Sequence, residues 1–399
     1  MSNSIKVAHF SSGHEGGAGL AARRLNQALN MSGINSKFFA ISSRRYLTEF
    51  NEYHIPRNVL QKIFSGLITF LQQNLKTKYF FSLFSFNVLD VRLIERLTLD
   101  STTILHFHNW YNLVSQKNII NLANLGYKIV LTMHDERFYT GGCHYSFDCV
   151  KFKVDCSNCP ELQYVLSKQP SRNLQTIGFK MQKLKHKIYF IAPSMWIQQR
   201  AIESKLLSEF DVKFIPNTLG PKIRSTNHGK AFNLSKPIKI GIANFDIQAY
   251  IKGFDTIRDL EELVSKNYQE FRIIYLKNIR NEKDFEEKFW NEIDFLLVPS
   301  KIDNSPNVIH EAKAYGVPVI ASLTGGISEL LNFQYDIPIS LDRLSANEII
   351  IRIKKWIKSK PEVFIRNRNL MQSQFESYIS ESVENHTKLY EEIAKNQVN

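Results

Sequence analysis

The chain has 399 residues, of which 43% are hydrophobic, and a formal net charge of +13 at pH 7. This length exceeds what one hydrophobic core usually serves, so we expect two domains. The opening residues lack an apolar signal segment, and the longest apolar run, near Ile63, is interrupted by Gln72 and Gln73 before reaching the roughly 18 to 20 residues of a membrane span. We therefore expect a soluble, cytoplasmic protein whose charge suits an anionic partner.

Apolar runs typical of strands alternate along the chain with helical patterns, which indicates parallel sheets covered by helices, an α/β fold. A polar segment without periodicity separates two such series and is interpreted as a linker. We expect an N-terminal domain over 1–217, the linker over 218–236, a second domain over 237–375 and a C-terminal helix over 376–399. The expected strands are 5–10, 37–42, 103–108, 128–134, 188–193, 212–216, 238–244, 271–276, 295–300 and 317–322.

In doubly wound domains, ligands bind beyond the carboxyl ends of the strands. The first strand is followed by Gly16, Gly17 and Gly19, which open a helix. Such a turn lets backbone N–H groups approach a phosphate, although an ordinary tight turn fits the pattern equally well. His134 with Asp135 follows the fourth strand, and His108 follows the third. Each histidine can bind a polar group or serve the structure.

The second domain has the sharper pattern, PSKIDNSPNVIHEAKAYGVPVIASLTGG. A strand ends at Ser300, and a helix is expected to start near Asn307 and to carry Glu311 in its second turn. A further strand ends before Gly325 and Gly326, which start another helix. Two such turns at one sheet edge favour a nucleotide pocket, because helix N-termini face anions and a carboxylate accepts ribose hydroxyls.

With these motifs the sequence resembles glycosyltransferase family 4, whose members are retaining, sugar-nucleotide-dependent enzymes of the GT-B fold. Within the family it resembles bacterial enzymes of the colanic-acid and exopolysaccharide type. The resemblance covers nearly the whole chain. In chain order it is carried by EGGAG, LHFHNWYN, TMHDERFYTGGCHYSFDC, CSNCPEL, IAPSMWI, IPNT, IKGFDTI, LLVPS, DNSPNVIHEAKAYGVPVIAS and ENHTKLYEEI.

The resemblance implies two Rossmann-like domains facing a cleft and a C-terminal helix that returns to the N-terminal domain. It also implies transfer of a sugar from a nucleoside diphosphate sugar to a hydroxyl, with retention and without a required cofactor. Gly16 and Gly17 would face the diphosphate, His134 the transferred sugar, and Lys252 the phosphates. Glu311 would bind the ribose. Backbone amides from Asn304, Ser305 and Asn307, and the turn at Gly325 and Gly326, would complete the donor site.

Two positions depart from the family pattern. Asp303 replaces the first glutamate of the E-x(7)-E motif, and the arginine often found shortly before the phosphate lysine is missing from IANFDIQAYIKG. Asp303, whose side chain is one methylene shorter, would contact the donor sugar through water, contact a differently shaped sugar or take no part. The orientation of the donor is therefore less defined than its class.

All cysteines of the chain lie in one segment, at Cys143, Cys149, Cys156 and Cys159. Clustered cysteines in a reducing compartment are more often metal ligands than disulfides. The last pair has the spacing of a zinc knuckle, but the first pair is wider than usual. Structural zinc is the leading interpretation, beside reduced thiols and disulfides.

Three functions account for these features. The first candidate is a glycosyltransferase of cell-surface polysaccharide synthesis. Its acceptor would be a saccharide or a lipid-linked saccharide, and the protein would contact the inner membrane face peripherally. Residues 163–200 contain seven bases and no acid, and Lys180, Lys183 and Lys187 would share one face of a helix. A catalytically degenerate GT-B scaffold is the second candidate. A basic zinc-knuckle protein that binds nucleic acid is the third, although no RNA-binding signature accompanies the cysteines, so we expect no nucleic-acid partner.

Overall fold

A computed structural model describes residues 5–41, 50–73, 77, 81–82, 88–89, 91–98, 100–220, 237–243, 250–276, 285–359 and 361–396. The chain divides into two compact units, Met1–Gly220 with Ser382–Asn399, and Pro221–Glu381. Most of the expected linker (221–236), most of the apolar segment 80–86 and residues 244–249, where the family arginine is missing, lie outside the described residues.

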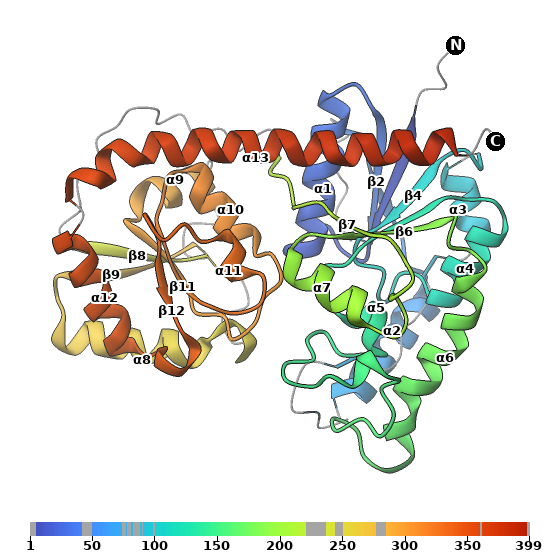
Figure 1. Ribbon diagram of the computed structural model, residues 1–399, viewed down its shortest axis with the longest axis horizontal. Helices are drawn as coiled ribbons and strands as arrows, with labels where there is room; N and C mark the ends of the chain where they lie inside the picture. Colours follow the sequence, from blue (N-terminus) through green and yellow to red (C-terminus); the bar gives the residue numbers. More distant parts are fainter. Residues whose placement is uncertain are drawn as a thin grey trace. The chain divides into compact units, whose positions relative to one another are not determined.

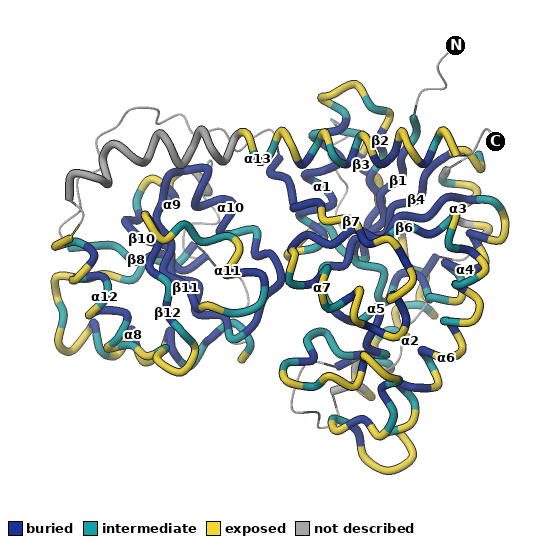
Figure 2. The backbone as a smooth tube through the Cα atoms, in the orientation of Figure 1, coloured by how far each residue is buried: buried dark blue, intermediate teal, exposed yellow. Residues whose placement is uncertain are grey.

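The first unit contains a seven-stranded sheet in the order β3-β2-β1-β4-β5-β6-β7, with every neighbouring pair parallel. Its central strands are continuous apolar runs that are buried along their length, as strands covered on both faces must be (Figures 1 and 2). The strands are β1 (Lys6–Ser11), β2 (Asn35–Ile41), β3 (Glu52–Ile55), β4 (Ile104–Phe107), β5 (Ile129–Thr132), β6 (Ile188–Ala192) and β7 (Val212–Phe214).

Three helices of the first unit begin at residues that favour a helix N-terminus. Ser115 and Ser194 accept hydrogen bonds from backbone N–H groups in the first turns of α4 and α7, and Pro170 lies in the first turn of α6. The helices are α1 (Gly16–Met31), α2 (Val59–Gln73), α3 (Val91–Thr98), α4 (Gln116–Asn124), α5 (Arg137–Thr140), α6 (Gln169–Gln182) and α7 (Met195–Glu203), with 3-10 turns η2 (Lys151–Lys153) and η3 (Tyr164–Lys168).

The last helix, α13 (Pro361–Lys395), ends on the first unit. Leu389, Tyr390 and Ile393 pack with α1 and with alternate residues of the central strands, such as Val7 and Ile104 (Figure 1). A C-terminal helix that returns to the N-terminal domain was expected from the family resemblance, and the structure confirms it.

The second unit contains a five-stranded, wholly parallel sheet in the order β12-β11-β10-β8-β9. Two apolar clusters cover its faces. Its strands are β8 (Ile238–Ile242), β9 (Phe271–Tyr275), β10 (Phe295–Val298), β11 (Val319–Ser322) and β12 (Ile337–Ile339). The other elements are η4 (Tyr250–Lys252), α8 (Phe254–Asn267), α9 (Phe285–Glu292), α10 (Asn307–Ala314), α11 (Ile327–Leu330), η6 (Leu341–Arg343) and α12 (Ala346–Ser359).

The ten expected strands are all present, with ends that differ by a few residues, so the predicted α/β fold is confirmed. β3 and β12 were not predicted. The shared helical face of Lys180, Lys183 and Lys187 was wrong, because α6 ends at Gln182 and a turn leads from there into β6. Among the described helices, none is both long and apolar enough to cross a membrane.

Candidate functional site

The loops that follow β8, β10 and β11 meet at the carboxyl edge of the second sheet, since these strands are neighbours. Lys252, from the loop after β8, forms an ion pair with the carboxylate of Asp303, from the loop after β10. The N–H of Gly326, after β11, donates to the backbone oxygen of Asp303 at 3.0 Å. Asp303 is nearly buried, whereas about a third of the Lys252 side chain is exposed. The structure thus brings three of the sequence-predicted residues together.

Glycine is required at two points of this edge. Gly325 has φ +51°, and a Cβ there would lie 2.2 Å from the backbone oxygen of Asp303. Gly253 has φ +74°, and a Cβ there would lie 2.1 Å from the backbone oxygen of Pro299. Only glycine combines this backbone conformation with so close an approach. The two glycines let the loops bearing Lys252 and Gly326 pack directly against the end of β10.

The remaining predicted donor residues of this unit lie between β10 and the second turn of α10. Asn304, Ser305 and Glu311 are buried, and Asn307 is the first residue of the helix. The hydroxyl of Ser305 shares a hydrogen bond of 3.0 Å with Nε2 of His310, whose ring stacks on Tyr378. A helix N-terminus, a buried carboxylate and a lysine therefore occur along one sheet edge, which is a suitable set of groups for a nucleoside diphosphate.

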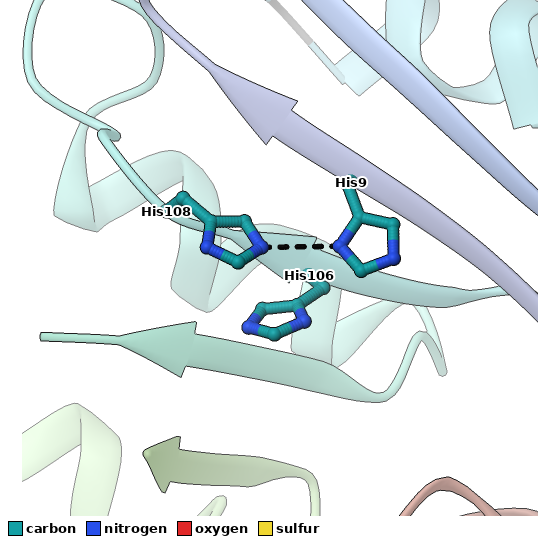
Figure 3. Close-up of side chains that lie close together, drawn as sticks. All are labelled: His9, His106 and His108. Carbon is teal, nitrogen blue, oxygen red and sulfur yellow. Dashed lines mark hydrogen bonds between the residues drawn. The ribbon is translucent and has the colours of Figure 1, made fainter. Parts of the chain in front are cut away.

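In the first unit, His134 lies at the carboxyl end of β5 and begins a chain of hydrogen-bonded rings. Its Nε2 lies 3.2 Å from Nδ1 of His108, and Nε2 of His108 lies 3.0 Å from Nδ1 of His9. Figure 3 shows the bonded pair His9 and His108, with His106 beside it. A neutral imidazole has one N–H and one acceptor nitrogen, so the direction of one bond fixes the tautomer of the next ring. The tautomer of His134 thereby depends on His108.

The ring chain is electrically neutral. Burial lowers the pKa of His9 to about 3 and that of His134 to about 4, and it holds the pKa values of His106 and His108 well below the usual range. His106 is held by the hydroxyls of Thr132 and Tyr390, each at 2.7 Å. His134 therefore faces its surroundings as a neutral hydrogen-bonding group.

His9, His106 and His108 are also the one group of the described residues whose candidate ligand atoms all lie within 4.8 Å of one another. A metal ion there would have to break bonds that both nitrogens of His106 already make, and no carboxylate belongs to the group. Nε2 of His9 finds no hydrogen-bond partner among the described residues. We interpret the cluster as a hydrogen-bonded network of neutral rings. His108 was predicted from the sequence, whereas His9 and His106 were not. The spacing of two residues between His106 and His108 could have indicated that both lie on one face of the strand.

Asp135 and Arg137 connect the ends of β4 and β5. Arg137 donates to the carboxylate of Asp135 at 2.8 Å and to Oδ1 of Asn109 at 3.0 Å. Burial alone would raise the pKa of Asp135, but Arg137 and His144 together hold it below its usual value. Asp135 is therefore ionised, whereas the adjacent His134 is neutral.

Gly16 and Gly17 begin α1 at the end of β1, as expected from the sequence. Gly16 has φ +78°, and a Cβ at either position would meet no atom within 4 Å. A Cβ at Gly19, in contrast, would lie 2.3 Å from the backbone oxygen of Gly13. Gly19 therefore serves the packing of the loop, and Gly16 and Gly17 leave the helix N-terminus uncovered by side chains of their own.

The four cysteines follow α5 and line one cavity of about 130 Å³. All four are free thiols; Cys156 and Cys159 are buried, and Cys143 and Cys149 are partly exposed. No three of the sulfur atoms lie within 4.8 Å of one another. Disulfides, one of the alternatives from the sequence, are not formed here.

Part of the second unit is similar to a known family of proteins. Residues 234–353 match the family model described as Glycosyl transferases group 1. The chain is similar to group 1 glycosyltransferases. It is 25% identical over 262 residues to the putative colanic acid biosynthesis glycosyl transferase WcaC of Escherichia coli K12, a match that covers 57% of this chain and 62% of that protein. The chain thus matches less than two thirds of that relative's length. The match confirms the predicted resemblance to enzymes of the colanic-acid type.

Solved structures of low sequence identity share the whole fold. Sucrose-phosphate synthase from Thermosynechococcus elongatus aligns with a TM-score of 0.63 at 13% identity, over 98% of this chain and 99% of that one. Anabaena Alr3699/HepE in complex with UDP-glucose aligns with a TM-score of 0.54 at 14% identity, over 96% and 100%. The group 1 glycosyltransferase model and these structures agree with the two parallel-sheet units, and the fold is GT-B.

Proposed function

We propose that the protein is a retaining glycosyltransferase of family 4 that moves a sugar from a nucleoside diphosphate sugar to an acceptor hydroxyl. The observation that carries the proposal is the meeting of three strand-end loops in the second unit, where Asp303 contacts both Lys252 and Gly326. This edge lies within the segment that matches the group 1 model. The complex of HepE with UDP-glucose, a protein of the same fold, supports the donor class.

Each residue has a role that follows from its chemistry. Lys252 neutralises the diphosphate, and Glu311 accepts the ribose hydroxyls. The backbone amides of Asn304, Ser305 and Asn307 and of the turn at Gly325 and Gly326 bind oxygen atoms of the phosphates and the sugar. In the first unit, Gly16 and Gly17 offer further amides. A diphosphate leaving group needs charge stabilisation more than a proton, and these groups supply it without a required cofactor.

His134 and Asp303 act on the transferred sugar. The neutral ring of His134, held by His108, can donate to or accept from a sugar hydroxyl without placing a charge beside it. Asp303 accepts from a sugar hydroxyl on one side while Lys252 is its counter-ion on the other. About a third of the Lys252 side chain is exposed, so an incoming phosphate can reach its ammonium group while Asp303 remains nearly buried.

We further propose a saccharide or lipid-linked acceptor in cell-surface polysaccharide synthesis, reached from the cytoplasm at the inner membrane face. Residues 163–200 contribute bases and no acid. Helix α2 adds a set of exposed apolar side chains, which suits contact with an anionic lipid surface. The set consists of Val59, Leu60, Ile63, Phe64, Leu67, Phe70 and Leu71.

The test begins with binding. Calorimetry with UDP-, GDP- and TDP-sugars should give one preferred donor, and Lys252→Ala should weaken its binding at least tenfold. Lys266→Ala changes an exposed lysine of α8 and is the matched control. Incubation of the preferred donor with lipid-linked saccharides should then release the nucleoside diphosphate, and NMR of the product should show the donor's anomeric configuration. Tight binding without turnover on any acceptor would favour the degenerate scaffold instead.

A further inference from the structure

We propose that Cys143, Cys149, Cys156 and Cys159 bind one zinc ion in a closed, structural site of four thiolates. The first observation is their placement. The segment between Cys143 and Cys159 folds so that all four side chains line the same cavity, which is large enough for an ion. The described residues that line this cavity include no histidine, and the four sulfur atoms outnumber the two carboxylates, Asp148 and Glu161. Zinc is the common structural metal for four thiolates, whereas Ca²⁺ and Mg²⁺ prefer oxygen.

The second observation is the backbone at the close pair. Cys156 has φ +55° and Asn158 has φ +50°, so two non-glycine residues of the turn C-S-N-C are left-handed. Such conformations are uncommon and persist where the surroundings fix them. The N–H of Cys156 donates to Lys151 and the N–H of Cys159 donates to Ser167, each at 3.0 Å. The backbone of the turn is thereby fixed beside the cavity, where the thiol of Cys156 donates to the backbone oxygen of Thr140, another lining residue, at 3.1 Å.

The third observation concerns the sulfur of Cys159. The backbone N–H groups of Glu161 and Leu162 form hydrogen bonds with this sulfur. N–H groups directed at a sulfur stabilise its thiolate, which is the form that binds metal. Lys151 also lines the cavity and provides a positive charge near the ligands. Without an ion, four neighbouring thiolates would repel one another, so metal binding is coupled to loss of their protons.

A four-thiolate site leaves no open position for water or substrate, so the ion acts on structure rather than on chemistry. Zn–S bonds of about 2.3 Å place the sulfur atoms about 3.8 Å apart in a tetrahedron. No three of the sulfur atoms lie within 4.8 Å of one another in the described structure, so the segment would have to close around the ion on binding it.

The loop that the metal would fix is tied to the end of β5. Cys143 forms a bridge with Phe81, and the next residue, His144, accepts at its backbone oxygen from the N–H of Glu136 at 2.9 Å. Nδ1 of His144 lies 3.6 Å from Asp135. Cys143, the first of the four proposed ligands, therefore directly precedes His144. His144 contacts Asp135, which follows His134 in the chain. Zinc would hold the loop beside this part of the candidate site.

The experiment measures metal in untagged protein, because a histidine tag would itself bind zinc. Protein expressed with added zinc and purified with a phosphine reductant should contain about one zinc per chain by plasma mass spectrometry. X-ray absorption should show a shell of four sulfur atoms near 2.3 Å. The double variant C156S/C159S should lose at least nine tenths of the metal. Ser157→Ala, within the same turn but with a side chain outside the cavity lining, should keep it.

A second measurement needs no variant and is unaffected if the double variant fails to fold. Titration of the wild-type protein with an organomercurial reagent should release the zinc in step with the blocking of four thiols, detected by a metallochromic dye. Three results would overturn the proposal: metal-free wild-type protein, iron in place of zinc, or zinc that stays bound after all four thiols are blocked. Loss of mass equal to two disulfides in metal-free protein would assign the cysteines to oxidation instead.

Discussion

The first unit holds neutral histidine rings in and just after its central strands, beside the ion pair of Asp135 with Arg137. The second unit has the ion pair of Lys252 with Asp303 and close backbone contacts at its strand ends. Both are parallel sheets covered by helices, so the difference lies in the chemistry of the loops and not in the architecture. The histidines of the first unit are neutral because burial disfavours their charge. Lys252 of the second unit is partly exposed and ion-paired with Asp303. A buried network of neutral rings disfavours charge, while a partly exposed lysine can receive a phosphate.

This contrast agrees with the proposed division of labour. A diphosphate carries charge and needs a site in which cations and amides are already present. A sugar hydroxyl is neutral and needs a directed donor or acceptor, which a ring of fixed tautomer provides. Substitutions that alter either unit alone can therefore test whether the two chemistries are separate.

The largest effect is expected at the close backbone contacts of the second unit. Gly253→Ala places a Cβ about 2 Å from the backbone of Pro299 at a positive φ, so we expect a loss of about 3 kcal/mol or more in the free energy of unfolding. Urea denaturation followed by tryptophan fluorescence measures it. Gly66→Ala, within α2 and without any atom near the new Cβ, is the control and should be neutral or slightly stabilising. Equal stability of the two variants would show that the loops do not depend on this contact.

Acid should weaken the first unit through its neutral histidines. The pKa values of His9, His134 and His386 are about 3, 4 and 4 in the folded protein, against about 6.5 when unfolded. Below pH 6.5 the unfolded chain binds more protons than the folded one, so stability is complete above that pH and falls as the pH drops towards 4. We expect a loss of about 2 kcal/mol for each of these histidines between pH 7 and pH 5.

Chemical denaturation at a series of pH values measures this slope. His386→Gln keeps a polar side chain on α13 and removes one of the titrating groups, so its slope should be smaller than that of the wild type. His186→Gln, on the turn before β6, is the control and should leave the slope unchanged. A wild-type stability that stays flat from pH 7 to pH 5 would contradict neutral burial of the cluster.

Glu311 should contribute to donor affinity without contributing much to folding. If its carboxylate accepts the ribose hydroxyls, Glu311→Ala should weaken donor binding by about 1.5 to 3 kcal/mol, the scale of hydrogen bonds to a charged group. Calorimetry with the preferred donor measures the loss, and the melting temperature checks the fold. Glu262→Ala, on the exposed side of α8, should bind the donor like the wild type. Unchanged affinity in Glu311→Ala would assign the ribose to another residue.

The smallest effect on binding is expected at Asp303. Asp303→Ala removes the proposed contact with the sugar, so turnover should fall about tenfold while the affinity for the free nucleoside diphosphate, which lacks the sugar, stays within about twofold. Asp303→Glu should also turn over poorly, because one added methylene intrudes on a fitted pocket. Equal losses in turnover and diphosphate affinity would mean that Asp303 only holds Lys252 and the loop.

The strands and the second-unit site could be predicted because their signals are local. Continuous apolar runs mark β5 and β10, and the glycine turns, proline and carboxylate around α10 stand within one stretch of sequence. β3 and β12 were not predicted because they are short. In β3 only the two end residues are buried, so the strand lacks a continuous apolar run. Lys183 and Lys187 were misplaced because the lysine spacing alone does not mark the end of α6.

The ring cluster could not be predicted from local signals. His9 and His106 face each other only because β1 and β4 pair in a register that joins these two positions. Tyr390 is hydrogen-bonded to His106 although the two residues are 284 positions apart in the sequence, and the sequence around either residue does not indicate this contact. The ion pair of Lys252 with Asp303 likewise depends on the adjacency of β8 and β10.

The return of α13 to the first unit has a consequence for protein synthesis. Leu389, Tyr390 and Ile393 complete one face of the first sheet, but the ribosome makes them after the whole of Pro221–Glu381. At about 5 to 20 residues per second, that face and the His106 ring wait roughly 10 to 30 s for their partners. During this interval the nascent first unit exposes apolar strand surface, which makes it a natural client for chaperones at the ribosome exit.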